Sequence, residues 1–414
     1  MSSSNNQFRA VHDQNFFQLA CILSAPMGLS SVIVEELANK YGAGTAISSI
    51  FLGNLILWLI ALSIISMASQ YRIDAIQNVR EYLGKYGALL TALILIFAFL
   101  NWFVHHINTS VTILRNIFDF DSYGGKDLIV RLGAALGFFS ALLVIGGIRF
   151  LKWMAVISLP GLFCYHLYAI FVSDYSIPSQ EGLGLSFFGI ISAMLILLPG
   201  VINLPTFFRH SRSRADSYLA LTLLTIFITF FEISSIWIRF SNFKQVFSQT
   251  GSYLIFFSGI TAICIILTLT LANLLNIYFA SAAWATFIPR FEGAKGHSII
   301  GLLGTAAYTF IQISSPIYFF EDLANAYIAT LGIVMLISFL IRLIVRHRPR
   351  TFEKTINGLS WLFGCAVATF LEIQNHDQGV YALLSGVCAS SLFFLAIIFI
   401  EETVWSARKI LADK

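Results

Sequence analysis

The feature that most limits the fold of this chain is a succession of apolar runs, each long enough to cross a bilayer. A membrane-spanning helix needs roughly 20 apolar residues, and the 414-residue chain is 57% hydrophobic and only 11% charged. So few charges cannot cover a soluble protein of this size. The sequence therefore predicts an all-α, multi-pass integral membrane protein. Twelve transmembrane helices are expected, near residues 16–39, 44–69, 86–113, 129–148, 152–173, 185–208, 216–238, 252–286, 298–315, 317–342, 356–372 and 379–406.

Lysine and arginine set the expected orientation. With the N-terminus inside, 19 of the 25 basic residues fall in inside loops or tails, and such an excess marks the cytoplasmic side. Both termini are therefore predicted to be cytoplasmic, with the chain in the plasma (inner) membrane. No secretory signal peptide is expected, because the polar start lacks an apolar core with a small-residue cleavage site. Residues 70–85 are expected to form an amphipathic surface segment.

Cysteine and charge usage narrow the expected partners. All five cysteines lie in or beside apolar runs without CxxC spacing, so neither a disulfide framework nor a metal site is expected. The formal net charge of +4 is small, and basic residues near membrane ends fit topology rather than nucleic-acid binding. We expect a small-molecule substrate and the lipid bilayer as partners, no cofactor, and a monomer or weak oligomer.

Proline and glycine interrupt two of the predicted spans. The first contains SAPMG at residues 24–28, and the sixth contains Pro199, Gly200, Asn203 and Pro205. A proline removes a backbone donor, and freed polar groups must face protein, ligand or ion rather than lipid. Single kinks are common, but matched broken helices indicate a transporter site. The residues expected near a substrate at these breaks are Met27, Gly28, Gly200 and Asn203.

The positions of the breaks predict the organisation of the chain. Because five spans separate them, the two interrupted helices cross in opposite directions, as in a five-plus-five inverted repeat. The expected parts are a cytoplasmic tail (1–15), a first repeat (16–173), a second repeat (185–342), two appended spans (356–406) and a cytoplasmic tail (407–414). No P-loop is present, so an ion gradient would supply the energy.

The third predicted span is unusually polar for the middle of a membrane helix. Polar groups inside lipid are costly, so such a face is expected to line a bundle interior or an aqueous cavity. The alternative is hydrogen bonding between helices. Two neighbouring stripes at helical spacing make up the face: Asn101, His105, Asn108 and Thr112, and then Trp102, His106 and Thr109.

The eighth span offers further polar candidates. Thr268, Thr270, Asn273 and Asn276 punctuate an otherwise apolar helix, and an amide offers the donors and acceptors that suit the edge of a planar heterocycle. Here too the alternative is helix joining. Buried carboxylates can carry a proton during transport, which makes Glu35 and Glu232 candidates. Their alternatives are a position near water and a satisfied interior carboxylate, respectively.

Four stretches resemble the cytosine and purine permease branch of the nucleobase:cation symporter family. They are LGNLILW (52–58), NWF (101–103), LPTFFRHSRSRADSYLA (204–220) and NIYFASAAWATF (276–287), and the spacing between them also matches. The resemblance implies a LeuT-type fold with broken helices 1 and 6 and a substrate between spans 1, 3, 6 and 8. It implies that Trp102 stacks on the base, that His106 stands where some members carry a glutamine, and that Asn276 reads the base edge.

The same resemblance leaves the coupling ion open. Sodium-coupled members pair carbonyls of the first break with hydroxyls on span 8, for which Thr268 and Thr270 are available. Protons carried by His105, His106 or Glu35 are the alternative. The polar residues that line span 6 in cytosine carriers are replaced here by LLPGVI at 197–202, so the sequence does not fix which base is carried.

The predicted function is therefore not enzymatic. We expect ion-coupled import of a nucleobase such as cytosine or a purine, or of a related planar heterocycle, by alternating access. The alternatives are an amino-acid or amine transporter of the same fold and a transporter-derived membrane sensor. A membrane-embedded metalloenzyme is disfavoured because adjacent histidines, His105 and His106, project about 100 degrees apart on a helix.

Overall fold

The computed structural model is described for residues 14–27, 31–69, 72–118, 125–172, 184–240, 251–314, 319–344, 353–374 and 379–412. Within these ranges the protein is helical, and the single β contact is an isolated bridge between Gln14 and Ser211. The helices are α1 (Phe16–Met27), α2 (Ser31–Tyr41), α3 (Ala43–Ser69), α4 (Ala75–Phe118), α5 (Gly125–Leu143), α6 (Gly147–Val172), α7 (Phe187–Phe208), α8 (Arg214–Phe240), α10 (Gly251–Trp284), α11 (Ala294–Ser314), α12 (Phe319–Ile344), α13 (Glu353–Gln374) and α14 (Gly379–Ala412), with 3-10 turns η3 (Val144–Gly146) and η4 (Pro289–Phe291).

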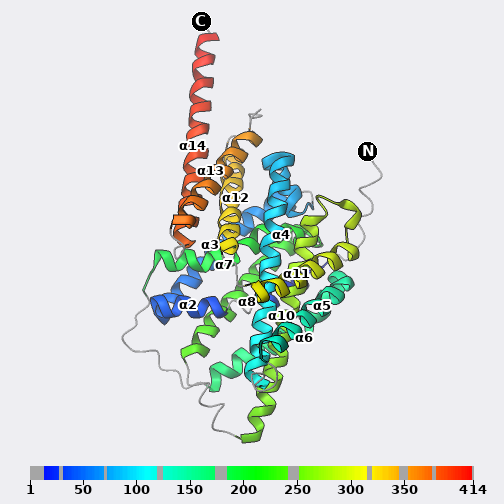
Figure 1. Cartoon of the computed structure of the whole chain (residues 1–414). Helices are drawn as coiled ribbons and strands as arrows, with labels where there is room; N and C mark the ends of the chain where they lie inside the picture. The colour runs from blue at the N-terminus through cyan, green and yellow to red at the C-terminus, as the bar shows by residue number, and fades with distance from the viewer. Residues whose placement is uncertain are drawn as a thin grey trace.

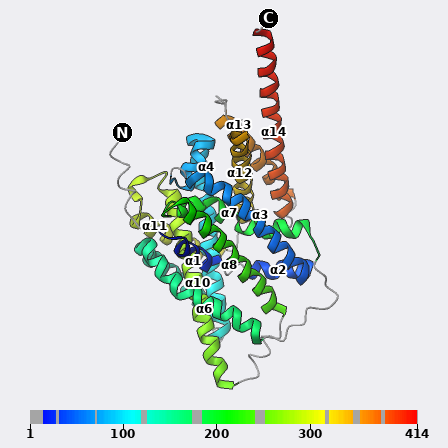
Figure 2. The ribbon, with the colours of Figure 1, turned by 180° about the vertical axis from the view of Figure 1, so that it is seen from behind.

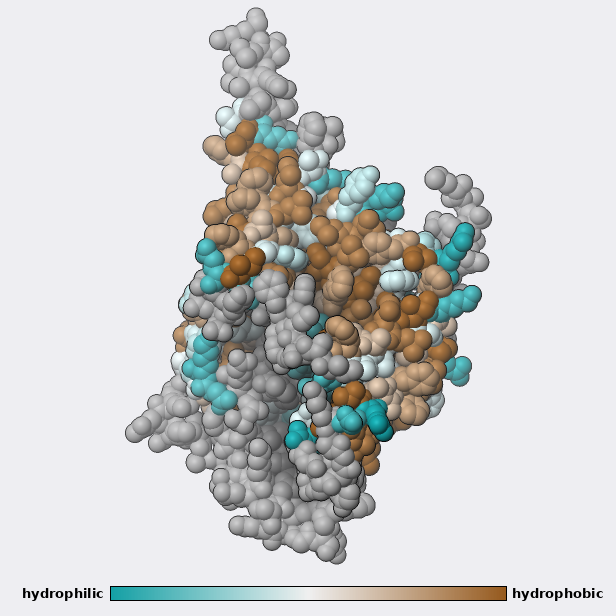
Figure 3. Space-filling view, viewed as in Figure 1, coloured by the Kyte–Doolittle hydropathy of each residue, from teal (hydrophilic) through white to brown (hydrophobic). Residues whose placement is uncertain are grey.

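Each predicted span coincides with a helix, the first one being divided between α1 and α2. In the described part of the chain, eight helical segments are long and apolar enough to cross a membrane. Large apolar side chains face outward on many of them, including Phe97, Phe171 and Phe399, which are 66%, 83% and 74% exposed. Hydrophobic residues dominate the coloured surface in Figure 3. Such a surface suits contact with lipid.

The bundle brings together helices that are far apart in the sequence (Figures 1 and 2). Helix α4 packs against α10, and α5 packs against α11. Helix α1 packs against α8 just as α7 packs against α3, and α6 contacts α10 just as α12 contacts α4. When each of the first five predicted spans is replaced by its counterpart among the next five, and the reverse, the same helix contacts result. That is the packing expected of a five-plus-five repeat, to which α13 and α14 are added.

Helix α4 starts as a surface segment and changes direction at Gly84. The backbone of Gly84 has φ 75° and ψ −171°, which is not helical, and glycine tolerates a positive φ without steric cost. A separate segment before the third span agrees with the expectation for residues 70–85. The segment is tied to the far end of the chain, because Asn357 Nδ2 donates to the Tyr82 carbonyl at 2.8 Å and the Arg342 guanidinium lies 4.2 Å from the centre of the Tyr82 ring.

The two predicted breaks have different outcomes. Helix α1 ends at Met27 and α2 begins at Ser31, on either side of residues 28–30, which lie outside the described part. The prediction of a broken sixth helix was wrong, because α7 runs without a gap through Pro199, Gly200 and Pro205. Each proline removes only one helical hydrogen bond. Residues 201–208 are all buried, so packing from neighbouring helices supports the continuous helix.

Candidate functional site

Three aromatic side chains meet about halfway along α4. The Trp102 ring centroid lies 5.7 Å from those of His105 and His106, and the two imidazoles are 6.1 Å apart. Trp102 and His106 are half-buried, whereas His105 is exposed. Because Trp102 and His106 are four residues apart, they project from the same face of the helix. That face carries the first half of the candidate site.

Helix α10 supplies the second half. Asn276 Nδ2 lies 3.2 Å from His106 Nδ1, so this contact between α4 and α10 requires Nδ1 to be unprotonated and to accept the amide hydrogen. Asn273, one turn away, is also buried. Its Oδ1 has no hydrogen-bond partner among the described residues. Such an oxygen can accept a hydrogen bond from a ligand or an ordered water.

The other polar residues of α4 are used differently. Asn108 Oδ1 accepts a hydrogen bond from Gln312 Nε2 of α11 at 3.1 Å. The hydroxyls of Thr109 and Thr112 donate to the carbonyls of His105 and Asn108 within α4. The helix-joining alternative therefore fits Asn108, while Trp102 and His106 remain on the face shared with the α10 amides.

The candidate ion-coupling residues lie along α10 and at the first break. Thr268 is fully buried and Thr270 is half-buried, and their hydroxyls donate to the carbonyls of Cys264 and Ile266 at 2.8 Å. Each hydroxyl oxygen retains its acceptor capacity. Gly28 and the side chains of Met27 and Glu35 lie outside the described part of the structure.

The two predicted residues of α7 do not join the His106–Asn276 contact. Gly200 is a half-buried helical residue. Asn203 is buried, and its Oδ1 accepts the Thr206 hydroxyl at 2.7 Å. The same hydroxyl accepts the backbone N–H of Ala75 at 3.2 Å. Asn203 thus helps to attach α7 to the start of α4.

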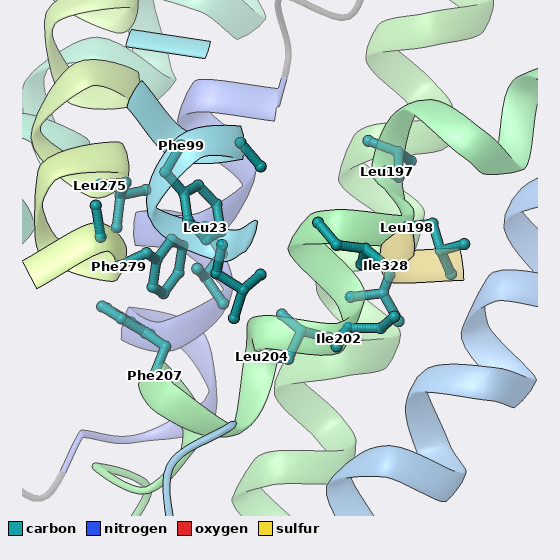
Figure 4. Packing of buried hydrophobic residues seen from close by; sticks show 14 of the residues in the cluster. Leu23, Phe99, Leu197, Leu198, Ile202, Leu204, Phe207, Leu275, Phe279 and Ile328 are labelled. Atoms are coloured by element: carbon teal, nitrogen blue, oxygen red, sulfur yellow. The ribbon is translucent and has the colours of Figure 1, made fainter. Parts of the chain in front are cut away.

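We call Trp102, His106, Asn273 and Asn276 the polar centre. An apolar layer separates it from the end of the bundle at which α4 begins and α10 ends. Leu23 of α1, Phe99 of α4, Phe207 of α7, and Leu275 and Phe279 of α10 converge there (Figure 4). The ring centroids of Phe99 and Phe279 are 5.2 Å apart, and those of Phe207 and Phe279 are 6.4 Å apart. All five side chains are buried, so the bundle is packed shut at this level.

Beyond this layer, polar side chains connect the ends of the helices. Arg209 Nη1 lies 3.3 Å from Asp74 Oδ2, and His210 Nε2 lies 2.9 Å from the Tyr278 hydroxyl. Gln14 N donates to the His210 carbonyl at 2.8 Å, which fastens the segment before α1. We call the Arg209–Asp74 and His210–Tyr278 contacts the end ties. No sequence pattern predicts these pairs, although Arg209 and His210 belong to the stretch at 204–220 that carries the resemblance.

Glu232 is a hydrogen-bonded interior carboxylate. Asn54 Nδ2 of α3 donates to Glu232 Oε2 of α8 at 2.6 Å and lies 3.0 Å from the Thr229 hydroxyl. Glu232 is buried, and a buried charge is tolerated when it is hydrogen-bonded. This contact joins two helices of the bundle. Among the described residues, no group of three His, Cys, Asp or Glu side chains converges to hold a metal ion.

Comparison with solved structures places this geometry in a known fold. No protein-family model and no curated protein sequence matches the chain. Mhp1, a nucleobase-cation-symport-1 family transporter in a closed conformation with bromovinylhydantoin bound, is similar at a TM-score of 0.66 and 17% identity over 95% of this chain and 94% of its own. A Na⁺-coupled sialic acid symporter in a substrate-bound outward-open state is similar at 0.64 and 15%, over 95% and 92%.

A third structure, a manganese transporter from Eremococcus coleocola, is similar at a TM-score of 0.57 and 13% identity over 97% of this chain and 95% of its own. Identities this low show a shared fold. The LeuT-type fold expected from the sequence is thus confirmed. One of the similar structures belongs to the nucleobase–cation symporters, the family that the sequence stretches resemble.

Proposed function

We propose that the protein is a cation-coupled secondary transporter that imports a nucleobase or a related planar heterocycle by alternating access. The observation that carries the proposal is the Trp102 indole beside the His106–Asn276 contact, where α4 meets α10. An indole face stacks on an aromatic ring, and base–aromatic stacking contributes about 1–3 kcal/mol. A buried amide provides matched donors and acceptors for the edge of such a ring.

The similar structures support this class of activity. Two of them are named as symporters or as a cation-symport family member, and one of these binds a hydantoin derivative. A hydantoin is a small ring with carbonyl and N–H groups on its edge, the kind of edge that Asn276 and Asn273 are suited to bind. We assign the coupling ion to Na⁺ or H⁺, with Thr268, Thr270, His105 and Glu35 as the candidate residues.

In the proposed transport cycle, the apolar layer and the end ties close the exit on one side of the substrate. Both lie toward the predicted cytoplasmic side, and both must separate before a substrate at Trp102 can leave in that direction. A ligand shifts such an equilibrium only by the difference between its affinities for the two states. We therefore assign the described conformation to the part of the cycle in which the cytoplasmic exit is closed.

Uptake by proteoliposomes tests the proposal. Purified protein is reconstituted and offered a panel of labelled nucleobases, hydantoins and amino acids under an imposed Na⁺ gradient, H⁺ gradient or neither. The proposal predicts uptake of at least one planar heterocycle, driven by one of the two gradients and absent from empty liposomes. Uptake of amino acids alone would contradict it and would favour the amino-acid transporter. Folded protein that takes up nothing would also contradict it.

A further inference from the structure

The amphipathic start of α4 is held at both of its ends by other helices. We call residues 75–83 the surface segment. One side of it is buried at helical spacing, through side chains that include Ile76, Val79 and Leu83, whereas Arg80 on the other side is exposed. Because hydrophobic burial is non-directional, it does not by itself fix where the two ends of the segment lie. Polar contacts at each end do so.

The first end of the surface segment is bound to α7. Ala75 N donates to Thr206 Oγ1 at 3.2 Å. Asp74, the residue just before the segment, pairs with Arg209 at 3.3 Å, and this pair is one of the end ties. The position of the surface segment therefore decides where the Asp74 carboxylate meets its partner in the closed end of the bundle.

The second end of the segment contacts α12 and α13. The backbone leaves the helical conformation at Gly84, and the terminal carbonyls of a helix need partners from outside it. Asn357, which is fully buried on α13, donates from Nδ2 to the Tyr82 carbonyl at 2.8 Å. The Arg342 guanidinium of α12 lies 4.2 Å from the centre of the Tyr82 ring, within the range of a cation–π contact. We call these two contacts the Tyr82 anchor.

The residues that make the Tyr82 anchor are themselves held in place. Arg342 Nε lies 2.6 Å from Glu353 Oε1, and Ser338 Oγ donates to the same oxygen at 2.8 Å. Asn357 Nδ2 also lies 3.2 Å from Ser338 Oγ. Because Ser338 and Arg342 lie on α12 and the other two residues lie on α13, the two helices meet Tyr82 as one hydrogen-bonded unit.

We propose that, within the transport cycle proposed above, the Tyr82 anchor positions the surface segment and so holds Asp74 against Arg209. Asn357 and Arg342 are then positioning residues of the closed end, and α13, which lies outside the two repeats, takes part in closing it. A helical segment of this length is about 13 Å long, so a small rotation about Gly84 displaces its Asp74 end by more than its Tyr82 end. A glycine accepts such a rotation readily.

The test reads the accessibility of the closed end rather than uptake, so it remains decisive whatever the protein carries. A membrane-impermeant maleimide is applied to inside-out vesicles, and its rate of reaction with Leu23→Cys, in the apolar layer, is measured in full-length protein without other cysteines. The variant is Asn357→Leu, alone and combined with Asp74→Asn. The matched control is Thr369→Val, which removes a 2.7 Å contact with the Tyr327 hydroxyl between the same two helices.

We expect Asn357→Leu to raise the alkylation rate about fivefold and Thr369→Val to leave it unchanged. Combined with Asp74→Asn, the same change should add less than about twofold, because the carboxylate that the anchor positions is already gone. An equal increase with and without Asp74 would show that Asn357 acts independently of it and would overturn the proposal. An unchanged rate in folded Asn357→Leu protein, or an equal increase in the control, would overturn it as well.

Arg342 provides a second test, which decides the matter if Asn357→Leu does not fold. Its side chain is 40% exposed, so its replacement is compatible with folding. Arg342→Gln removes the cation from the Tyr82 ring and should raise the alkylation rate about two- to fivefold. Arg342→Lys keeps a cation there and should restore the wild-type rate. Equal rates for these two variants would overturn the positioning role of Arg342.

Discussion

The polar centre and the end ties both involve helix α10, but their polar groups are satisfied to different extents. At the centre, Asn273 Oδ1 is buried without a regular hydrogen bond, next to the His106–Asn276 contact. Two residues beyond Asn276, the Tyr278 hydroxyl is paired with His210. Leaving a buried polar group unsatisfied costs about 1–3 kcal/mol. In a binding site, the ligand can supply the missing hydrogen bond and remove this cost. The end ties bind no ligand, so unpaired groups there would only destabilise the closed state.

The largest expected effect is at the centre, for Asn276→Leu. This change removes the amide proposed to read the edge of the bound ring and leaves His106 Nδ1 without its donor. At about 1–3 kcal/mol for a lost buried hydrogen bond, substrate affinity should fall roughly 10- to 100-fold. Equilibrium binding of the transported base measures it. Asn108→Leu is the control, since Asn108 bonds to Gln312, and a larger loss there would reverse the assignment.

An effect of about tenfold is expected at the end ties, for Asp74→Asn. Arg209, whose side chain is 19% exposed, would lose its carboxylate partner, and a partly buried charge without a counter-charge disfavours the closed state. We expect the open population to rise about tenfold, which corresponds to about 1.4 kcal/mol. The measurement is the alkylation rate of Leu23→Cys, placed in the apolar layer of a protein without other cysteines. An unchanged rate would show that the pair does not hold this end closed.

A smaller effect is expected for Tyr278→Phe. The substitution keeps the ring and removes only the hydroxyl that contacts His210 Nε2 at 2.9 Å. A single hydrogen bond contributes about 0.5–1.5 kcal/mol, so the same alkylation rate should rise only a few-fold, with substrate affinity nearly unchanged. If affinity fell more than accessibility rose, Tyr278 would belong to the polar centre instead.

The smallest effect is expected for His106→Gln. A glutamine amide can still accept from Asn276 and donate to the neighbouring Asn273 oxygen, so substrate affinity should stay within about threefold of the wild type. His106→Leu, which can do neither, should resemble Asn276→Leu. If uptake is driven by H⁺ and His106→Gln abolishes the coupling without changing affinity, His106 rather than His105 or Glu35 carries the proton.

The sequence predicted the fold more completely than the site. Apolar runs predicted the positions of the spans, and the amphipathic pattern predicted a separate segment before the third span, whereas the direction change at Gly84 came from the structure. That His106 and Asn276 lie near one site was expected only from the family resemblance, which places spans 3 and 8 on either side of the substrate. Continuity of α7 was not predictable, since it depends on the packing around residues 201–208. Pairs such as Asp74 with Arg209 and His210 with Tyr278 join residues more than 60 positions apart, which no local pattern reveals.

Substrate binding to two tryptophan variants shows whether Trp102 contacts the transported molecule. Trp153, on α6, is 61% exposed and provides the matched control. We predict that Trp102→Ala weakens binding of the transported base about 10- to 100-fold, because about 1–3 kcal/mol of stacking is lost, while Trp153→Ala binds like the wild type. Wild-type affinity in folded Trp102→Ala protein would show that Trp102 does not contact the transported molecule.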